Sequence, residues 1–76
     1  MIDYLELKIR IIRMYGSLAK FCEETNVNRS WLSNTIKHGV PMRAETILRF
    51  VELLDIPEAE VGGYFFRKKS CEINAE

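Results

Sequence analysis

Short polar and basic side chains near residue 30 offer hydrogen-bonding chemistry. Arg29, Ser30 and Asn34 fall within two turns of a predicted helix, at positions outside its narrow apolar stripe of Leu32 and Ile36. A guanidinium can form two hydrogen bonds with guanine, a carboxamide can do the same with adenine, and a hydroxyl can donate or accept. The residue types alone are therefore compatible with two interpretations, contacts with the edges of base pairs or a solvated helix face.

Residues for catalysis or metal binding are not grouped in the sequence. There is no serine, histidine and acid set, no pair of carboxylates in a cleft-forming context and no glycine-rich phosphate loop. His38, the single histidine, is interpreted as a cap near a helix C-terminus. Cys22 lies on an apolar helical face, far in sequence from Cys71, which favours a reduced and packed thiol. We expect a non-enzyme with no metal and no cofactor.

Length and composition indicate one small folded domain. A chain of 76 residues buries only about 60% of its unfolded surface, which is too little for two cores. No apolar stretch approaches the roughly 20 residues needed to span a bilayer, and no signal peptide is visible at the N-terminus. We therefore expect a cytoplasmic protein without a membrane partner.

The charges balance overall but are unevenly distributed. The chain has 11 basic and 11 acidic residues, whereas nucleic-acid-binding domains usually carry a basic excess. Five bases lie between residues 17 and 49: Lys20, Arg29, Lys37, Arg43 and Arg49. Residues 50–66 contain acids and no bases. The sequence thus predicts one mildly basic end and one acidic end.

Apolar spacing and capping residues predict an all-α domain of five helices. Asp3, Ser17 and Asn28 are N-cap candidates, and the positions of Gly16 and Asn26 are typical of helix ends. The expected helices cover residues 4–15, 18–25, 29–37 and 43–54, with a weak fifth helix that begins after Pro57 and is interrupted by Gly62 and Gly63. Residues 1–66 should form the domain and residues 67–76 a polar tail.

Residues 17–37 have the pattern of a DNA-binding helix-turn-helix. A short helix, a turn at residues 25–27 and a second helix with a thin apolar stripe would leave the second helix exposed to the major groove. Trp31 is interpreted as half-buried at the edge of the domain. The alternative, that its ring stacks on a sugar or a thymine methyl group, stays open.

The segment from Leu18 to Gly39, with Pro41 and the helix that follows, resembles the Cro and lambda-type repressor family. Residues 26–33, Asn-Val-Asn-Arg-Ser-Trp-Leu-Ser, take the place of the usual Gly-Val-Ser-x-x-x-Ile-Ser. Phe21 and Cys22 stand where Leu-Ala is usual. The first four residues and residues 56–66 are also similar to short phage regulators of Gram-positive hosts.

The resemblance implies a compact, lambda-repressor-like domain that binds a double-stranded DNA operator and regulates transcription in a phage or prophage switch. It assigns base reading to Arg29, Ser30 and Asn34, and it assigns contacts with the DNA backbone to Ser17, Asn28, Lys37 and Arg43. Leu18 replaces a common Gln, Asn26 replaces the turn Gly, and His38 replaces a helix-ending Gly. These departures mean that the resemblance does not transfer an operator sequence.

The first predicted helix is apolar nearly all round, which leaves two interpretations open. Its additional apolar residues are Leu5, Ile9, Ile12 and Met14. They are either covered by the fifth helix and the tail, or they form a contact with another chain. The second interpretation supports an alternative function, a modulator of repression that binds and sequesters a partner repressor. A homodimer surface near the chain end is expected from Val61, Tyr64, Phe65 and Phe66.

Overall fold

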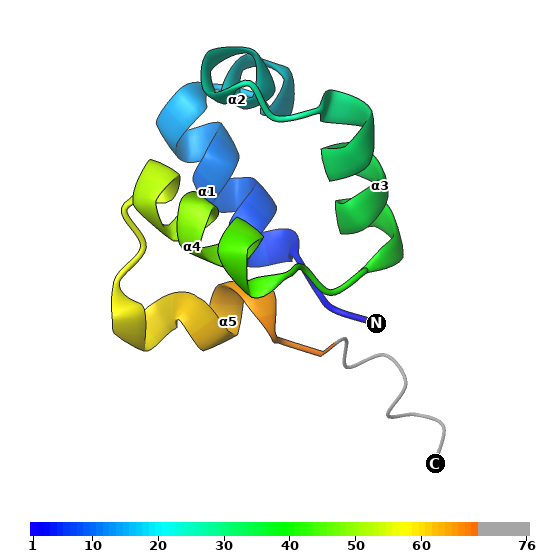
Figure 1. Ribbon diagram of the computed structural model, residues 1–76, viewed down its shortest axis with the longest axis vertical. Coiled ribbons are helices and arrows are strands. Elements are labelled where there is room, and N and C mark those ends of the chain that lie inside the picture. Colours follow the sequence, from blue (N-terminus) through cyan, green and yellow to red (C-terminus); the bar gives the residue numbers. More distant parts are fainter. Residues whose placement is uncertain (69–76) are drawn as a thin grey trace.

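The computed structural model describes residues 1–68, and these residues form a compact all-helical domain (Figure 1). Its elements are α1 (Leu5–Tyr15), α2 (Leu18–Thr25), α3 (Arg29–His38), α4 (Ala44–Leu54), the 3-10 turn η1 (Glu58–Glu60) and α5 (Val61–Phe65). The predicted all-α class with five helices is confirmed. Within residues 1–68, β pairing is limited to one antiparallel bridge between Ile2 and Lys68. None of the helices in this range has the length and apolarity needed to cross a membrane.

The predicted caps of α2 and α3 are confirmed. The Ser17 hydroxyl accepts a hydrogen bond of 3.0 Å from the Lys20 amide, and the Asn28 side chain accepts one of 2.8 Å from the Trp31 amide. Each bond satisfies an amide that has no partner within the first turn of a helix. Asn26 closes α2 in the left-handed conformation, with a φ of 64°.

Three predicted helix boundaries differ by one residue from the observed ones. Asp3 does not occupy the N-cap of α1, because Tyr4 does, but the Asp3 carboxylate accepts a hydrogen bond of 3.0 Å from the Leu5 amide. His38 is the last helical residue of α3 rather than its cap, which is Gly39 at a φ of 64°. Arg43 is the N-cap of α4 and not its first helical residue. Glycine adopts the left-handed conformation at little cost, so Gly39 lets α3 continue for one more residue.

Aromatic rings link the helices inside the core. Phe50 of α4 is at the centre, with ring centroids 5.4 Å from Phe21 of α2 and 6.4 Å from Phe65 of α5, and both pairs meet edge to face. Tyr15 of α1 extends this cluster, 4.9 Å from Phe21. Edge-to-face contacts add to the stabilisation that burial of the rings provides. The same core buries Thr35 of α3, which the apolar pattern did not identify.

The fifth helix is shorter than the sequence indicates. Pro57 precedes η1, and α5 then covers only five residues, two of which are Gly62 and Gly63. Glycine carries a large entropic cost in a helix, so tertiary contacts must hold this segment in place. Arg10 of α1 provides one of them, because its guanidinium donates to the Leu54 carbonyl at 3.0 Å and to the Tyr64 hydroxyl at 3.4 Å.

The two ends of the described chain meet beside the C-terminus of α3. The Ile2 amide donates to the Gly39 carbonyl at 2.9 Å, and the Asp3 amide donates to the Arg67 carbonyl at 2.6 Å. Arg67 and Lys68, which the sequence analysis assigned to the polar tail, are therefore paired with the N-terminal segment. The rest of that tail, residues 69–76 with Cys71, lies outside the described residues.

Candidate nucleic-acid interface

Local hydrogen bonds fix the turn between α2 and α3. The Val27 amide donates to the Cys22 carbonyl at 3.2 Å, and the half-buried Val27 side chain packs against the core. Arg49 of α4 donates from Nη2 to the Thr25 carbonyl at 2.7 Å, which satisfies an acceptor that the end of α2 leaves open. These contacts hold α3 at a fixed position relative to α2 and α4.

One side of α3 is buried and the other faces solvent. Leu32 and Thr35 contribute the buried side, and Figure 1 shows α3 at an edge of the domain. Arg29, Ser30 and Asn34, the predicted base-reading residues, are all exposed. Within residues 1–68, no hydrogen bond or ion pair holds their side chains. Their polar groups are therefore available to an external partner.

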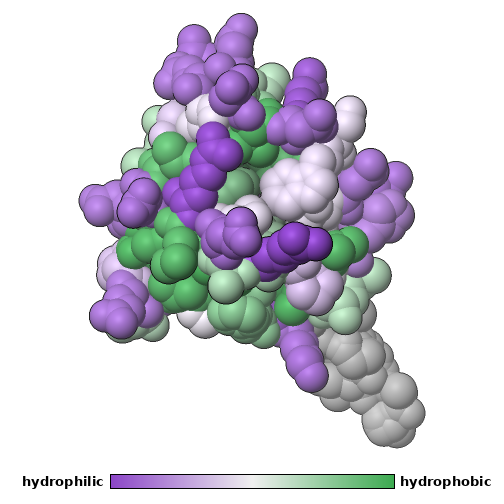
Figure 2. Space-filling view, viewed as in Figure 1, coloured by the Kyte–Doolittle hydropathy of each residue, from purple (hydrophilic) through white to green (hydrophobic). Residues whose placement is uncertain are grey.

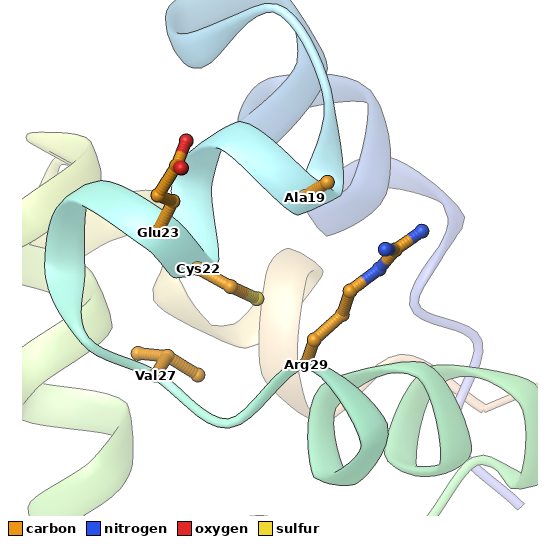
Figure 3. A pocket seen from close by; sticks show the side chains of 5 residues that line it. All are labelled: Ala19, Cys22, Glu23, Val27 and Arg29. Atoms are coloured by element: carbon orange, nitrogen blue, oxygen red, sulfur yellow. The ribbon is translucent and has the colours of Figure 1, made fainter.

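Arg29 borders an open hollow between α2 and α3 (Figure 3). The hollow has a volume of ≈ 360 Å³ and is lined by Ala19, Cys22, Glu23, Val27 and Arg29. The Arg29 side chain extends from the first turn of α3 toward Ala19 in the first turn of α2, whereas the Glu23 carboxylate points away from the guanidinium. The cation of Arg29 thus lies where the N-terminal ends of both helices face solvent.

Cys22 is a free, buried thiol beneath this hollow. Burial raises the pKa of Cys22, and the positive charge of Arg29 offsets part of that increase. A buried thiol with a raised pKa stays protonated and behaves as a small apolar side chain. Cys22 therefore serves packing between α2 and the core.

The predicted backbone-contact residues lie at the ends of three different helices. Ser17 precedes α2, Asn28 and Lys37 lie at the two ends of α3, and Arg43 precedes α4. All four residues are exposed. The caps occupy an acceptor oxygen of Ser17 and of Asn28, but the hydroxyl hydrogen and the amide NH₂ group remain as donors. All four residues can therefore donate hydrogen bonds to an anionic backbone.

Trp31 lies at the opposite edge of α3 from Arg29. Its side chain is 40% exposed, and its ring meets Phe50 edge to face at 6.3 Å. A second hollow beside it, of ≈ 260 Å³, also involves Asn26 and Arg49. Trp31 is therefore more exposed than the half-buried position that the sequence predicted, although its ring contacts the core. The sequence analysis did not identify the hydrogen bond by which Arg49 braces the turn, because Arg49 and Thr25 lie 24 positions apart and no local pattern relates them.

The additional apolar side chains of α1 are exposed. Leu5, Ile9 and Ile12 are 56%, 41% and 42% exposed, and we call these three residues the α1 ridge. Met14 is 46% exposed but is separate from the ridge, because a rotation of about 100° per residue places it opposite Leu5. The expected coverage of these side chains by α5 is wrong, because they are exposed although α5 packs on α1. The tail residues 69–76, the other part of that interpretation, lie outside the described residues.

The four residues of the predicted C-terminal dimer surface differ in their burial and do not form one exposed surface. Phe65 is fully buried, so its assignment to a surface is wrong. Val61 and Tyr64 are half-buried against the core, and Tyr64 contacts the Arg10 guanidinium, whose central carbon lies 5.8 Å from the ring centroid. Phe66 alone of the four is exposed, at 56%. A five-residue helix has too few turns to bury Phe65 and also present a continuous apolar face.

Polarity also varies over the surface (Figure 2). In this view, hydrophilic side chains line the outer edge where α2 and α3 lie, and apolar side chains gather over α4 and the segment that leads to α5. The basic candidates of the α3 edge are separated in the chain from the acids of residues 50–66. Within residues 1–68, no group of histidine, cysteine and acidic side chains is arranged to hold a metal ion.

Comparison with known proteins identifies a family. No curated protein and no solved structure matches the chain. The match to a family covers every residue that the structure describes, from the N-terminal segment that pairs with Gly39 to the bridge at Lys68. Residues 1–68 match the family described as "Protein of unknown function (DUF739)", and the chain belongs to that family.

Proposed function

We propose that the protein is a sequence-specific DNA-binding transcriptional regulator of the Cro and repressor type, in which α2 and α3 form a helix-turn-helix. The observation that carries this proposal is the exposed surface of α3. Arg29, Ser30 and Asn34 are exposed there without partners inside residues 1–68, on a helix whose opposite side is fixed in the core. The resemblance to phage regulators further suggests a phage or prophage switch.

The dimensions of α3 suit the proposed contact. Ten residues give a helix of about 15 Å, and the major groove, about 12 Å wide, admits an α-helix. Arg29 would bond guanine and Asn34 would bond adenine, with Ser30 between them. Ser17, Asn28, Lys37 and Arg43 would bond phosphates and so fix the register of α3 in the groove.

The proposal is tested by DNA binding at several salt concentrations. The DNA flanking the protein's own reading frame supplies the probe for a gel-shift experiment, with scrambled DNA as control. Each neutralised phosphate contributes about 0.9 to the log-log salt slope. If Lys37 and Arg43 are the only phosphate contacts, the log-log salt slope should be about two, and each further contact should increase it. A folded protein that shows no salt-sensitive binding to any of these probes contradicts the proposal.

A second candidate function is the modulator that binds and sequesters a partner repressor. The exposed α1 ridge and the zero net charge favour it. An apolar complex of this kind should change little with salt, in contrast to DNA binding. Ile9→Asp combined with Ile12→Asp should abolish such a complex and leave DNA binding intact. If the wild-type protein binds a repressor but no DNA, and these substitutions abolish repressor binding, the modulator function replaces the proposed DNA-binding function.

A further inference from the structure

The α1 ridge is a continuous apolar stripe on the solvent side of α1. Leu5, Ile9 and Ile12 are spaced by four and three residues, so they lie along one line of the helix surface. The opposite side of the helix packs in the core through Leu7 and Ile11, which are fully buried. None of the three ridge residues belongs to the core cluster of the described chain, and the apolar surface that they expose costs hydration free energy until another surface covers it.

The charges beside the ridge are arranged asymmetrically. A rotation of about 100° per residue places Glu6 and Arg13 on the same flank of the ridge, about 20° apart around the helix, and Lys8 on the other flank. Glu6 lies in the first turn and Arg13 in the last turn. Both are exposed. The flank thus has a negative end and a positive end.

We propose that the α1 ridge is a self-association surface, on which α1 of a second copy packs antiparallel with Glu6 of each copy facing Arg13 of the other. In an antiparallel pair related by a two-fold axis, equivalent flanks face each other, so the negative end of one meets the positive end of the other. A two-fold axis that passes midway between residues 9 and 10 of the two helices places Glu6 of one copy at the same height along the helix as Arg13 of the other copy. The same axis sets Ile12 of one copy between Leu5 and Ile9 of the other, so the ridges interdigitate.

A second copy fits this surface better than an unrelated protein does, because the charge pattern is complementary to itself. The same two-fold axis generates two Glu6–Arg13 contacts from one flank. Within the copy, Glu6 already lies 4.0 Å from Arg67 in an exposed ion pair, whereas no ion pair within residues 1–68 involves Arg13. The burial of Phe65 also interrupts the competing C-terminal surface, in which Phe66 alone is exposed.

The contact is small, so the association should be weak. A helix of 11 residues is about 16 Å long, and the area that it can bury lies at the low end of specific interfaces. The two Lys8 side chains face each other across the other flank, which opposes association. The pairing does not depend on DNA binding and is tested with the protein alone.

Charge reversal with sedimentation equilibrium of the full chain tests the pairing. Glu6→Lys and Arg13→Glu each replace two attractions per dimer by two repulsions, and each should weaken self-association by about 5- to 30-fold. The double variant, Glu6→Lys with Arg13→Glu, restores opposite charges and should return the dissociation constant to within about threefold of wild type. Recovery in the double variant requires that both residues meet in the same assembly of identical chains.

A matched control and an apolar variant complete the experiment. Lys8→Glu replaces the Lys8–Lys8 repulsion between the two copies by a repulsion between two glutamates, so it should leave self-association nearly unchanged. Ile9→Asp should abolish association while circular dichroism shows an intact fold, since Ile9 is exposed. A monomer at about 1 mM protein, a dimer insensitive to Ile9→Asp, or a double variant weaker than both single variants would each overturn the proposal. So would capture of a different protein on the ridge by a chain that stays monomeric.

Discussion

The Ile2 amide donates a hydrogen bond of 2.9 Å to the carbonyl oxygen of Gly39, the residue that ends α3. The N-terminal segment therefore lies directly against the C-terminus of the candidate DNA-reading helix. A Cβ atom at Gly39 would lie 2.6 Å from the Ile2 oxygen and 2.7 Å from the Ile2 nitrogen. Both atoms belong to the backbone, so neither can move aside without shifting this segment.

Gly39→Ala should accordingly destabilise the protein. The left-handed conformation alone costs a residue with a Cβ about 1–2 kcal/mol, and the overlap with Ile2 adds to that cost. Urea denaturation measures the loss. Gly63→Ala is the control, because a Cβ there meets no atom within 4 Å and alanine in a helix should stabilise by about 0.5–1 kcal/mol. Equal stability of Gly39→Ala and wild type would contradict the predicted overlap.

Tyr4 should make stability depend on pH in the alkaline range. Its hydroxyl donates to the Val40 carbonyl at 2.6 Å. Burial raises the pKa of Tyr4 above its ordinary value of 10.0, and the Met42 backbone offsets part of the increase. The unfolded chain therefore ionises first, and the contribution of Tyr4 is complete below about pH 10 and lost as the pH rises further.

The measurement is the free energy of unfolding between neutral pH and about pH 11, a range set by the ordinary tyrosine pKa. Tyr4→Phe should cost about 1 kcal/mol at neutral pH and should reduce the alkaline decline. Tyr15→Phe removes a similar hydrogen bond, to the Leu53 carbonyl at 3.0 Å, and controls for the loss of a hydroxyl. An alkaline decline as steep in Tyr4→Phe as in wild type would disprove the assignment.

Phe65 and Phe66 should respond differently to the same substitution. Phe65→Ala removes a fully buried ring and should destabilise the protein by about 3–5 kcal/mol. Phe66 is 56% exposed, so Phe66→Ala should change stability by less than about 0.5 kcal/mol and should leave self-association unchanged. Thermal unfolding and sedimentation measure the two effects. A dimer lost in Phe66→Ala would place the interface at the chain end instead of the α1 ridge.

Arg29→Ala and Asn34→Ala should each weaken specific DNA binding by about 1–3 kcal/mol and relax the preference at one base pair. Both residues are exposed, so the fold should remain intact. Competition between operator and scrambled DNA separates lost selectivity from lost affinity, and binding to scrambled DNA should change less. If both variants keep full affinity and full selectivity, α3 does not read the bases.

Lys37→Ala and Arg43→Ala should weaken binding to all DNA sequences alike. Each loses one phosphate contact, which should reduce the log-log salt slope by about one unit. Lys8→Ala is the matched control, because Lys8 is an exposed cation on α1 outside the proposed DNA interface. Gel shifts over a series of salt concentrations measure the slopes. An unchanged slope in both variants would remove these residues from the interface.

Much of the helical framework followed from the sequence because it depends on neighbours within one or two turns. The Ser17 and Asn28 side chains each accept a hydrogen bond from the amide three residues further along the chain, and Asn26 takes the left-handed conformation that ends α2. The exposed positions of Arg29, Ser30 and Asn34 followed from the same short-range periodicity. Local preferences are encoded in local residues, so they can be read without knowledge of the fold.

Contacts between distant residues were decided only by the tertiary structure. Tyr4 meets Val40 across 36 positions, and Arg10 meets Leu54 across 44. No spacing predicts such pairs, because they depend on which helices pack together. The adjacent Phe65 and Phe66 have nearly the same local preferences, yet the first fills the space beside Phe50 and the second is exposed. The exposed ridge on α1 was likewise settled only by how α5 packs, because an apolar residue can be assigned to core or surface only after every other element has been placed.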